Sequence, residues 1–409
     1  MSTVRPFAGL RPPKDLVTSL ACPPYDVINT AEARALAAGN PRSFLHVSRP
    51  EIDLAPGVDE HSEPVYARGA ENLEAFKRSG WLVPDPGPRF YLYRQREGGH
   101  SQLGLVACAS VDEYQDGRIK KHELTRVDKE EDRTRHIDRL GAHDEPVFLT
   151  YRARPGIDAL ANRLAAQPPA YDFTVGETSH TLWVVDGAAD LATFEREFAA
   201  IPLLYIADGH HRSAAALRVR ERRARLPGHT GREEYNAFLA VIYPHDQMRI
   251  LDYNRLVFDL NGLGAEAFVR RLDAAFTCRP ADQKKPTRAG DFGMYLGGRW
   301  HLLTAKPGTF DAADPVASLD VSVLQANLLA PVLGIQDPRT DKRIDFVGGA
   351  RGTAELERRV DSGEAKVAFS MFPTSIDQLL RVADAGKIMP PKSTWFEPKP
   401  RSGLVVHGF

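Results

Sequence analysis

The sequence contains few cysteines and almost no net charge, and both shortages exclude classes of protein. Only three cysteines occur among 409 residues, at Cys22, Cys108 and Cys278. Cysteines so far apart exclude a disulfide scaffold and a CxxC zinc ribbon, and they fit a reducing cytoplasm. Lys and Arg total 53 against 54 for Asp and Glu, a formal net charge of −1. Dedicated nucleic-acid binders usually carry a basic excess, so we do not expect a nucleic acid as partner.

Long hydrophobic runs are also missing. No stretch of about eighteen apolar residues occurs, so we expect no membrane-spanning helix, and the opening residues MSTVRPFAGLRPP contain no apolar signal core. The Walker pattern GxxxxGK(S/T) and the dinucleotide pattern GxGxxG are absent as well. We therefore expect a cytoplasmic protein with no membrane partner and no nicotinamide, flavin or haem cofactor.

The composition that remains is that of a globular protein, with 43% hydrophobic and 26% charged residues. A chain of 409 residues exceeds what one hydrophobic core usually supports, so we expect two or three packed units. We place these parts at 1–150, 151–285 and 286–409. Nothing in the sequence predicts an oligomeric state.

Apolar segments of strand length alternate with amphipathic segments of helical length. The expected strands lie at 89–95, 102–111, 146–151, 180–185, 203–208 and 238–243. The expected helices lie at 65–80, 191–199, 210–226 and 264–276. This alternation is typical of α/β or α+β proteins, so we expect a mixed α/β fold around a larger mixed sheet.

The segment LLYIADGHHRSAAAL, at 203–217, holds the densest chemistry. An apolar strand ends there, Gly209 allows a tight turn, and a helix begins whose first N–H groups lack intrahelical partners. Arg212 adds a fork suited to phosphate, and histidines can carry charge near neutral pH. The alternative is that the aspartate only caps the helix and the histidines lie on the surface. The candidate site residues are Asp208, His210, His211, Arg212 and Ser213.

A second candidate segment is KKHELT, at 120–125, which combines cations, an imidazole, a carboxylate and a hydroxyl. A carboxylate can take a proton from a substrate hydroxyl, and adjacent cations can hold phosphoryl oxygens. We assign Glu123 as the proton acceptor, with Asp208 as the other candidate. Lys121, His122 and Arg133 are candidate phosphate- or substrate-binding residues. The alternative is a charge-mixed helix start exposed to solvent.

Two proline-rich segments supply further candidates for binding. In PPYDVI, Tyr25 and Asp26 follow two prolines that stiffen the chain, and the aspartate suits a substrate ammonium group or a metal. It suits a helix cap or a turn equally well. Arg42, in NPRSFLHV, is expected to face the same pocket.

The tail PPKSTWFEPKP suits an anion or a nucleotide phosphate, because it offers hydroxyls and lysines in a stiff loop. Its candidate residues are Lys392, Ser393, Thr394 and Lys399. The alternative is a C-terminal arm that its aromatic residues hold against the protein.

No metal site is assigned to protein side chains. Asp208, His210 and His211 are possible ligands, but adjacent histidines rarely bind the same ion well. We expect Mg²⁺ to arrive with a nucleotide or pyrophosphate, held mostly by phosphate oxygens.

The strand–DGHHR–helix element resembles the motif of ParB/sulfiredoxin-like proteins, most closely the free-serine kinases. The resemblance implies that Asp208, His210, His211 and Arg212 contact phosphate groups and substrate. The whole chain resembles the domain-of-unknown-function family 1015, whose bacterial members often lie beside serine-biosynthesis genes. The segments that carry this resemblance are PFAGLRP, PPYDVI, NPRSFLHV, KKHELTRVDKEEDR, DEPVFLTY, IADGHHR and MPPKSTWFEPKPRSGL.

These observations predict a small-molecule phosphotransferase that acts on L-serine or O-phosphoserine, as a kinase or in reverse as a phosphatase. Its partners would be serine, phosphoserine, and a nucleotide or pyrophosphate. The alternative is a ParB-like nucleotide-binding regulatory protein without turnover. A phosphodiesterase or nuclease would need a metal cluster that the sequence does not indicate.

Overall fold

The chain folds into two units, each built on its own β-sheet. The computed structural model describes residues 2–409. The first unit combines Met1–Met248 with Pro398–Phe409, and the second is Arg249–Glu397. The expected boundaries near residues 150 and 285 do not coincide with the limits of these units. Residue 150 lies inside β8 (Val147–Tyr151), which pairs with β11 and β12, and residue 285 lies within the second unit.

The first unit contains a nine-stranded sheet in the order β6-β11-β8-β12-β5-β4-β10-β9, with β1 paired to β5. The pairs β11–β6 and β12–β8 are parallel, and the other pairs are antiparallel. The mixed α/β class predicted from the sequence is therefore confirmed. The remaining strands of this sheet are β1 (Val4–Arg5), β4 (Phe90–Glu97), β5 (His100–Ser110), β6 (Ile119–Lys120), β9 (Tyr171–Val175), β10 (Thr178–Val185), β11 (Leu204–Asp208) and β12 (Ala237–Pro244).

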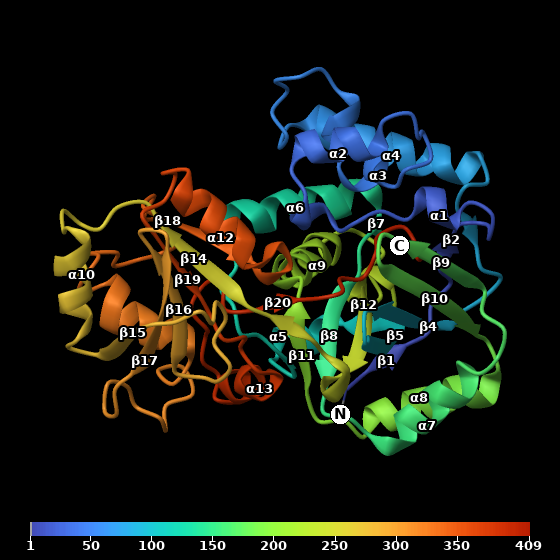
Figure 1. Ribbon diagram of the computed structural model, residues 1–409. Helices are drawn as coiled ribbons and strands as arrows, with labels where there is room; N and C mark the ends of the chain where they lie inside the picture. The colour runs from blue at the N-terminus through green and yellow to red at the C-terminus, as the bar shows by residue number, and fades with distance from the viewer. Residues whose placement is uncertain (1) are drawn as a thin grey trace. The chain divides into compact units, whose positions relative to one another are not determined.

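Successive residues of the central strands alternate between the two faces of this sheet. On one face, Ala240 and Ile242 join a core that includes Phe194 and Phe198 of α8. Helices α7 (Pro155–Leu164) and α8 (Ala188–Ala199) lie together along this face (Figure 1). On the other face, Leu239 and Val241 lie beside Val405, so the last residues of the chain return to cover the first unit's sheet.

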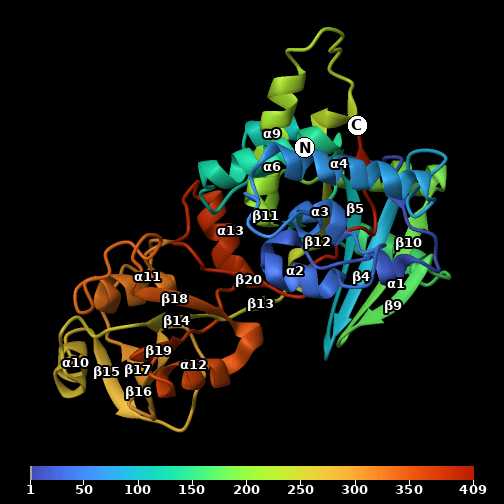
Figure 2. The same cartoon turned by 90° about the horizontal axis from the view of Figure 1, so that it is seen from above.

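Helices α4, α6 and α9 pack in sequence, with α6 between the other two. Figures 1 and 2 both show α6 beside α9. The N-terminal part adds short elements, including the pairs β2–β3 and β7–β21. The bounds are α1 (Val17–Leu20), α2 (Thr30–Ala37), α3 (Leu45–Ser48), α4 (Glu63–Arg78), α5 (Val111–Gln115), α6 (Val127–Leu140), α9 (His210–Arg223), β2 (Leu10–Arg11), β3 (Val83–Pro84), β7 (Ala142–His143) and β21 (His407–Gly408).

The second unit contains a six-stranded sheet in the order β15-β17-β16-β19-β14-β18, in which every neighbouring pair is antiparallel. The predicted helix at 264–276 ends early, because α10 stops at Leu272 and β15 begins at Phe276. The bounds are α10 (Ala265–Leu272), α11 (Asp320–Leu324), α12 (Gly352–Asp361), α13 (Ile376–Asp384), β13 (Ile250–Leu251), β14 (Tyr253–Val257), β15 (Phe276–Pro280), β16 (Asp291–Leu296), β17 (Arg299–Ala305), β18 (Ile344–Gly348), β19 (Val367–Ser370) and β20 (Trp395–Phe396).

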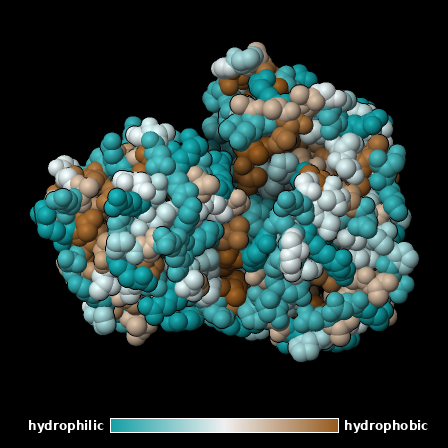
Figure 3. All heavy atoms as spheres, viewed as in Figure 1, coloured by the Kyte–Doolittle hydropathy of each residue, from teal (hydrophilic) through white to brown (hydrophobic). Residues whose placement is uncertain are grey.

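The surface seen in Figure 3 is largely hydrophilic, with smaller hydrophobic areas among the polar ones. Among residues 2–409, none of the helices has the length and apolar character needed to cross a membrane. The three cysteines are free thiols, and Cys22 and Cys108 are buried.

Candidate functional site

The junction between β11 and α9 forms the sharp turn that the sequence predicted. Gly209 has a φ of 94°, in the left-handed region that glycine adopts without strain. A Cβ at this position would lie 3.1 Å from Nε of Arg212, so glycine also makes room for that guanidinium. No side chain among residues 2–409 caps α9. The first N–H groups of the helix therefore remain available to an anion.

Asp208 is paired with a lysine from the end of the chain. Nζ of Lys399 donates to Oδ2 of Asp208 at 2.5 Å, and the backbone N–H of Gly209 donates to Oδ1 at 2.8 Å. Burial alone would raise the pKa of Asp208, but Lys399 and Arg212 outweigh burial and hold it well below its usual range. Asp208 is thus an ionised carboxylate with little affinity for a proton.

Arg212 is a buried cation surrounded by acidic groups. Its side chain donates to the carbonyl of Pro146, and its Nη2 lies 3.6 Å from Oδ2 of Asp26. Burial would lower the pKa of Arg212, but Asp26, Glu145 and Asp208 raise it above its ordinary value. Its buried Nε has no hydrogen-bond partner among residues 2–409. Arg212 therefore keeps its charge and one donor that the protein does not use.

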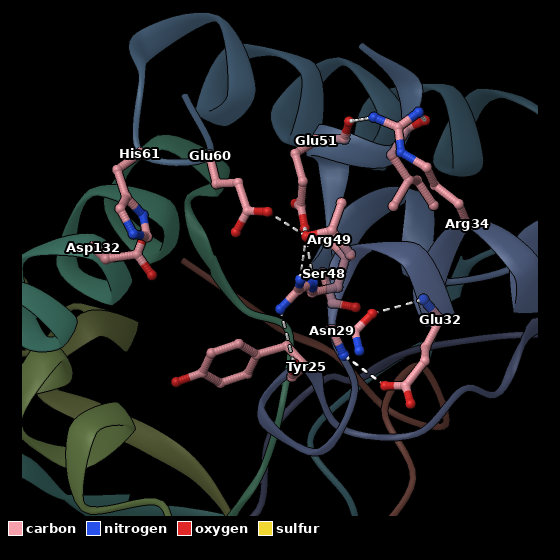
Figure 4. A network of polar contacts seen from close by, with 12 residues as sticks. Tyr25, Asn29, Glu32, Arg34, Ser48, Arg49, Glu51, Glu60, His61 and Asp132 are labelled. Atoms are coloured by element: carbon pink, nitrogen blue, oxygen red, sulfur yellow. Dashed lines mark hydrogen bonds and ion pairs between the residues drawn. The ribbon is translucent and has the colours of Figure 1, made fainter. Parts of the chain in front are cut away.

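The PPYDVI segment lies beside Arg212, through its Asp26. The guanidinium of Arg133 lies 4.1 Å above the ring of Tyr25, and the Tyr25 N–H donates to Oε1 of Glu145 at 2.9 Å. From the other side, Arg49 donates to the Tyr25 carbonyl at 3.1 Å (Figure 4). These contacts hold the segment where Asp26 faces Arg212.

The start of α2 is built by the adjacent residues of the same network. Figure 4 shows Asn29 and Glu32 bonded reciprocally in a capping box. Asp26 was one candidate for the N-cap of this helix, but Asn29 is the residue that caps α2. Arg42 was expected to face the same pocket as Tyr25 and Asp26. Its guanidinium lies 5.8 Å from the ring centre of Trp81.

Glu145 is a central group that the sequence reasoning missed. Its side chain is 5% exposed, and Oε1 accepts hydrogen bonds from the Tyr25 N–H and the Ser402 hydroxyl, each at 2.9 Å. Burial and the neighbouring Asp144 raise the pKa of Glu145 to about 8, against the lowering effect of Arg212. The available signal was two consecutive acids, Asp144 and Glu145, one proline before the mostly apolar strand VFLTY, because such acids become buried when the strand does.

The KKHELT segment lies beside the DGHHR turn because β6 pairs in parallel with β11. The His122 N–H donates to Nε2 of His210 at 3.5 Å, and Nδ1 of His210 lies 3.8 Å from Oε2 of Glu123. The structure therefore brings together two candidate segments that are far apart in the sequence. One ring nitrogen each of His122 and His210 and one oxygen of Glu123 lie within 4.8 Å of one another.

The histidines do not carry the charge that the sequence suggested. Burial lowers the pKa of His122 to about 4, and burial together with His122 holds the pKa of His210 well below its usual value. Burial also lowers the pKa of His211, whose Nε2 accepts from the Arg126 N–H at 3.1 Å. The positive charge at this site therefore comes from arginine and lysine.

Two other predicted residues of the first unit have partners inside the protein. Lys121 places its Nζ 3.9 Å from the ring centre of Tyr114, and burial lowers the pKa of that lysine. Ser213 is fully buried, and its hydroxyl donates to the Gly209 carbonyl at 3.2 Å. Ser213 thus stabilises the turn from within the helix.

The tail residues divide between the two units. Lys399 belongs to the first unit and pairs with Asp208, whereas Lys392, Ser393 and Thr394 belong to the second. There, the Ser393 hydroxyl donates to the Pro390 carbonyl at 2.6 Å, and Lys392 has a φ of 57°. Within the unit that carries α9, only Lys399 of the four is present.

The family model described as "Protein of unknown function (DUF1015)" matches residues 4–322. The chain belongs to this family, which confirms the predicted membership. No curated protein matches the chain.

Several solved structures resemble the chain at low identity. A free serine kinase variant in complex with AMP is 12% identical, with 71% of this chain and 87% of that chain covered and a TM-score of 0.36. A conserved hypothetical protein from Pyrococcus furiosus is 14% identical, with coverages of 71% and 90% and a TM-score of 0.34. SbnI with a C-terminal truncation, from Staphylococcus aureus, is 13% identical, with coverages of 72% and 84% and a TM-score of 0.38.

Proposed function

We propose that this protein is a phosphotransferase that moves a phosphoryl group to or from a small hydroxyl compound, with L-serine or O-phosphoserine as substrate. The observation that carries the proposal is the start of α9, where an uncapped helix end meets the buried cation Arg212. N–H groups without an intrahelical partner and a guanidinium fork are the donors that phosphoryl oxygens require. The choice of serine follows the resemblance of the DGHHR element to free-serine kinases.

The charges around this helix start suit a phosphoryl group. Arg212 supplies a permanent cation with an unused donor, and Lys399 adds a second cation, held in place by Asp208. An ammonium group has three donors, so Lys399 can keep its contact with Asp208 while it binds a phosphoryl oxygen. The substrate ammonium group of serine would bind Asp26, whose side chain is one-third exposed.

Glu123 is the better of the two proposed proton acceptors. Asp208 is already paired with Lys399, and its lowered pKa makes it a weak base. The Glu123 side chain is 45% exposed, so a substrate can reach it. In this role Glu123 takes the proton from the serine hydroxyl.

The proposed reaction is an in-line transfer. The serine oxygen bonds to phosphorus while the bond from phosphorus to the donor's leaving oxygen breaks, and the hydroxyl proton passes to Glu123. Arg212 and the first N–H groups of α9 stabilise the equatorial oxygens of the transferring group. The donor would be a nucleotide or pyrophosphate with its Mg²⁺, and we place the reaction in the cytoplasm.

Phosphorus NMR of the full-length protein tests this function. O-phospho-L-serine with Mg²⁺ is examined alone and with ADP or pyrophosphate, and serine is examined with ATP, ADP or pyrophosphate. We expect a new phosphorylated product or free phosphate in at least one mixture, and its loss in Arg212→Lys. The matched control is Arg126→Lys, because the Arg126 side chain is 71% exposed and paired with Asp128.

Saturable nucleotide binding without product in any mixture would overturn the transferase and favour the regulatory alternative. Equal turnover of Arg212→Lys and the wild-type protein would remove α9 from the proposed mechanism.

A further inference from the structure

Three potential metal ligands meet beside the start of α9. They are His122, Glu123 and His210, whose nearest ligand atoms all lie within 4.8 Å of one another. This is the one such group of three among residues 2–409. The parallel pairing of β6 with β11 produces it, because residues that follow parallel neighbouring strands emerge at the same edge of a sheet.

His122 carries an unused ligand atom. The residue is 2% exposed, and its Nδ1 has no hydrogen-bond partner among residues 2–409. The ring lies edge to face against that of His210, with centres 4.4 Å apart and an interplanar angle of 89°. Buried polar atoms without a partner are rare, so the unpaired nitrogen points to a ligand.

The spacing of the other two residues is close to that of a coordinated pair. Nδ1 of His210 lies 3.8 Å from Oε2 of Glu123. To ligate an ion through Nδ1, a neutral His210 carries its proton on Nε2 and gives up the long 3.5 Å hydrogen bond that Nε2 accepts from the His122 N–H. Metal–ligand bonds of the length found in zinc sites place two tetrahedral ligands about 3.4 Å apart. A small movement of the half-exposed Glu123 side chain closes this difference, and its exposure gives an ion a route from solvent.

We propose that His122, Glu123 and His210 bind a divalent first-row transition-metal ion such as Zn²⁺. Two neutral imidazoles and one carboxylate suit Zn²⁺ and its neighbours, whereas Mg²⁺ and Ca²⁺ prefer oxygen ligands alone. Three protein ligands leave a coordination position for water or substrate.

This site goes beyond the proposed phosphoryl transfer and does not depend on it. The two proposals meet at Glu123, which cannot be a metal ligand and a proton acceptor at the same time. If both hold, bound Zn²⁺ inhibits the transfer.

The test is a calorimetric titration of Zn²⁺ into full-length protein stripped of metal with EDTA, with a parallel titration of Mg²⁺. We expect one Zn²⁺ per chain and no comparable binding of Mg²⁺. Glu123→Gln and His210→Gln should each weaken Zn²⁺ binding at least about tenfold, since even outer partners of a metal contribute that much. The matched control is His229→Gln. His229 lies 3.0 Å from Glu233 but belongs to no group of three, so its loss should leave Zn²⁺ binding unchanged.

Circular dichroism shows whether each variant is folded, and Glu123→Gln is the decisive variant because its side chain is half-exposed. Co²⁺ provides an independent readout. Its visible absorption should change when it binds the wild-type protein, and this change should be absent with Glu123→Gln. The proposal is overturned if Zn²⁺ does not bind, or if it binds no better than Mg²⁺. It is also overturned if Glu123→Gln and His210→Gln bind Zn²⁺ as tightly as the wild-type protein. These readouts report on the ion alone, so their failure would leave the phosphotransferase proposal standing.

Discussion

Each unit buries an arginine, and the two arginines have opposite surroundings. In the first unit, Arg212 is surrounded by Asp26, Glu145 and Asp208, which raise its pKa despite burial. In the second unit, burial lowers the pKa of Arg255 to about 10. Both arginines are buried, but acidic neighbours compensate the charge of Arg212, whereas the charge of Arg255 is poorly compensated.

The hydrogen bonds of Arg255 explain this difference. Its guanidinium donates to the carbonyls of Tyr253 and Lys392, and it lies 5.3 Å from the ring centre of Phe346. Carbonyls satisfy the donors without balancing the charge, so Arg255 ties backbone segments together. Arg212 has acidic neighbours on several sides and keeps one donor unused. We infer that clustered opposite charges, more than burial, distinguish the two arginines.

The largest expected effect separates these two arginines by activity. Arg212→Lys keeps a charge but removes the guanidinium fork, so turnover should fall by about 100- to 1,000-fold, as for the loss of one transition-state donor. Arg255→Lys should leave turnover nearly unchanged and lower the free energy of unfolding by about 1–3 kcal/mol, through lost buried hydrogen bonds. Steady-state kinetics and denaturant unfolding measure the two quantities. A reversed pattern would contradict the comparison.

A second comparison uses one buried acid from each unit. Burial and Asp144 raise the pKa of Glu145 from an ordinary value of 4.5 to about 8, so the folded protein keeps a proton that the unfolded chain loses. Stability should therefore fall as pH rises between these two values. Glu145→Gln removes this loss, and its stability should decline less from about pH 5 to pH 8. Urea unfolding across this range measures the slope, and parallel slopes for variant and wild type would contradict the assignment.

Asp320 is the matched acid in the second unit. Burial raises its pKa from 3.8 to about 7, against a hydrogen bond from the Gly290 N–H. Asp320→Asn should likewise reduce the loss of stability with rising pH, but over a pH range that ends near 7. Arg212→Lys should leave the pH range of the Asp320 effect unchanged. The same substitution removes the guanidinium that lowers the pKa of Glu145, so it should shift the pH range of the Glu145 effect. If Arg212→Lys shifted both pH ranges equally, the charges around Arg212 would have no local effect on Glu145.

The smallest expected effect compares two glycines with positive φ. Gly209→Ala meets both a φ of 94° and the Arg212 guanidinium at 3.1 Å, and should cost about 1–3 kcal/mol of stability. Gly141→Ala, at a φ of 61° in the same left-handed region and with its nearest contact an ordinary 3.4 Å, should cost only the backbone strain, about 1 kcal/mol. Thermal unfolding compares the two, and only Gly209→Ala should also lower turnover. Equal costs would mean that Arg212 moves aside freely.

Local pattern was sufficient for much of the first unit's sheet. Apolar runs predicted β4, β5, β8, β10, β11 and β12, because buried central strands are apolar on both faces. The strand β9 (Tyr171–Val175) was missed, since it alternates with exposed Asp172 and Thr174 beside a proline-rich turn. The expected boundary at residue 150 does not follow the sheet, because the pairing of β12 with β5 across that position is a long-range property.

The turn at the start of α9 was predictable from the sequence, but the arrangement of side chains around it was only partly so. The DGHHR segment contains its own turn signal, Gly209, between a strand and a helix. The meeting of His122 with His210 depends on the pairing of β6 with β11, which no local pattern encodes. The charge expected on the histidines was wrong because burial, which a sequence does not report, removes it.

The most direct test of the central claim is a crystal structure of the full-length protein with O-phospho-L-serine. The proposal predicts phosphate oxygens within about 3 Å of the first N–H groups of α9 and of the Arg212 guanidinium. It also predicts the serine ammonium group at Asp26. A phosphate bound by other residues, with none at the start of α9, would contradict it.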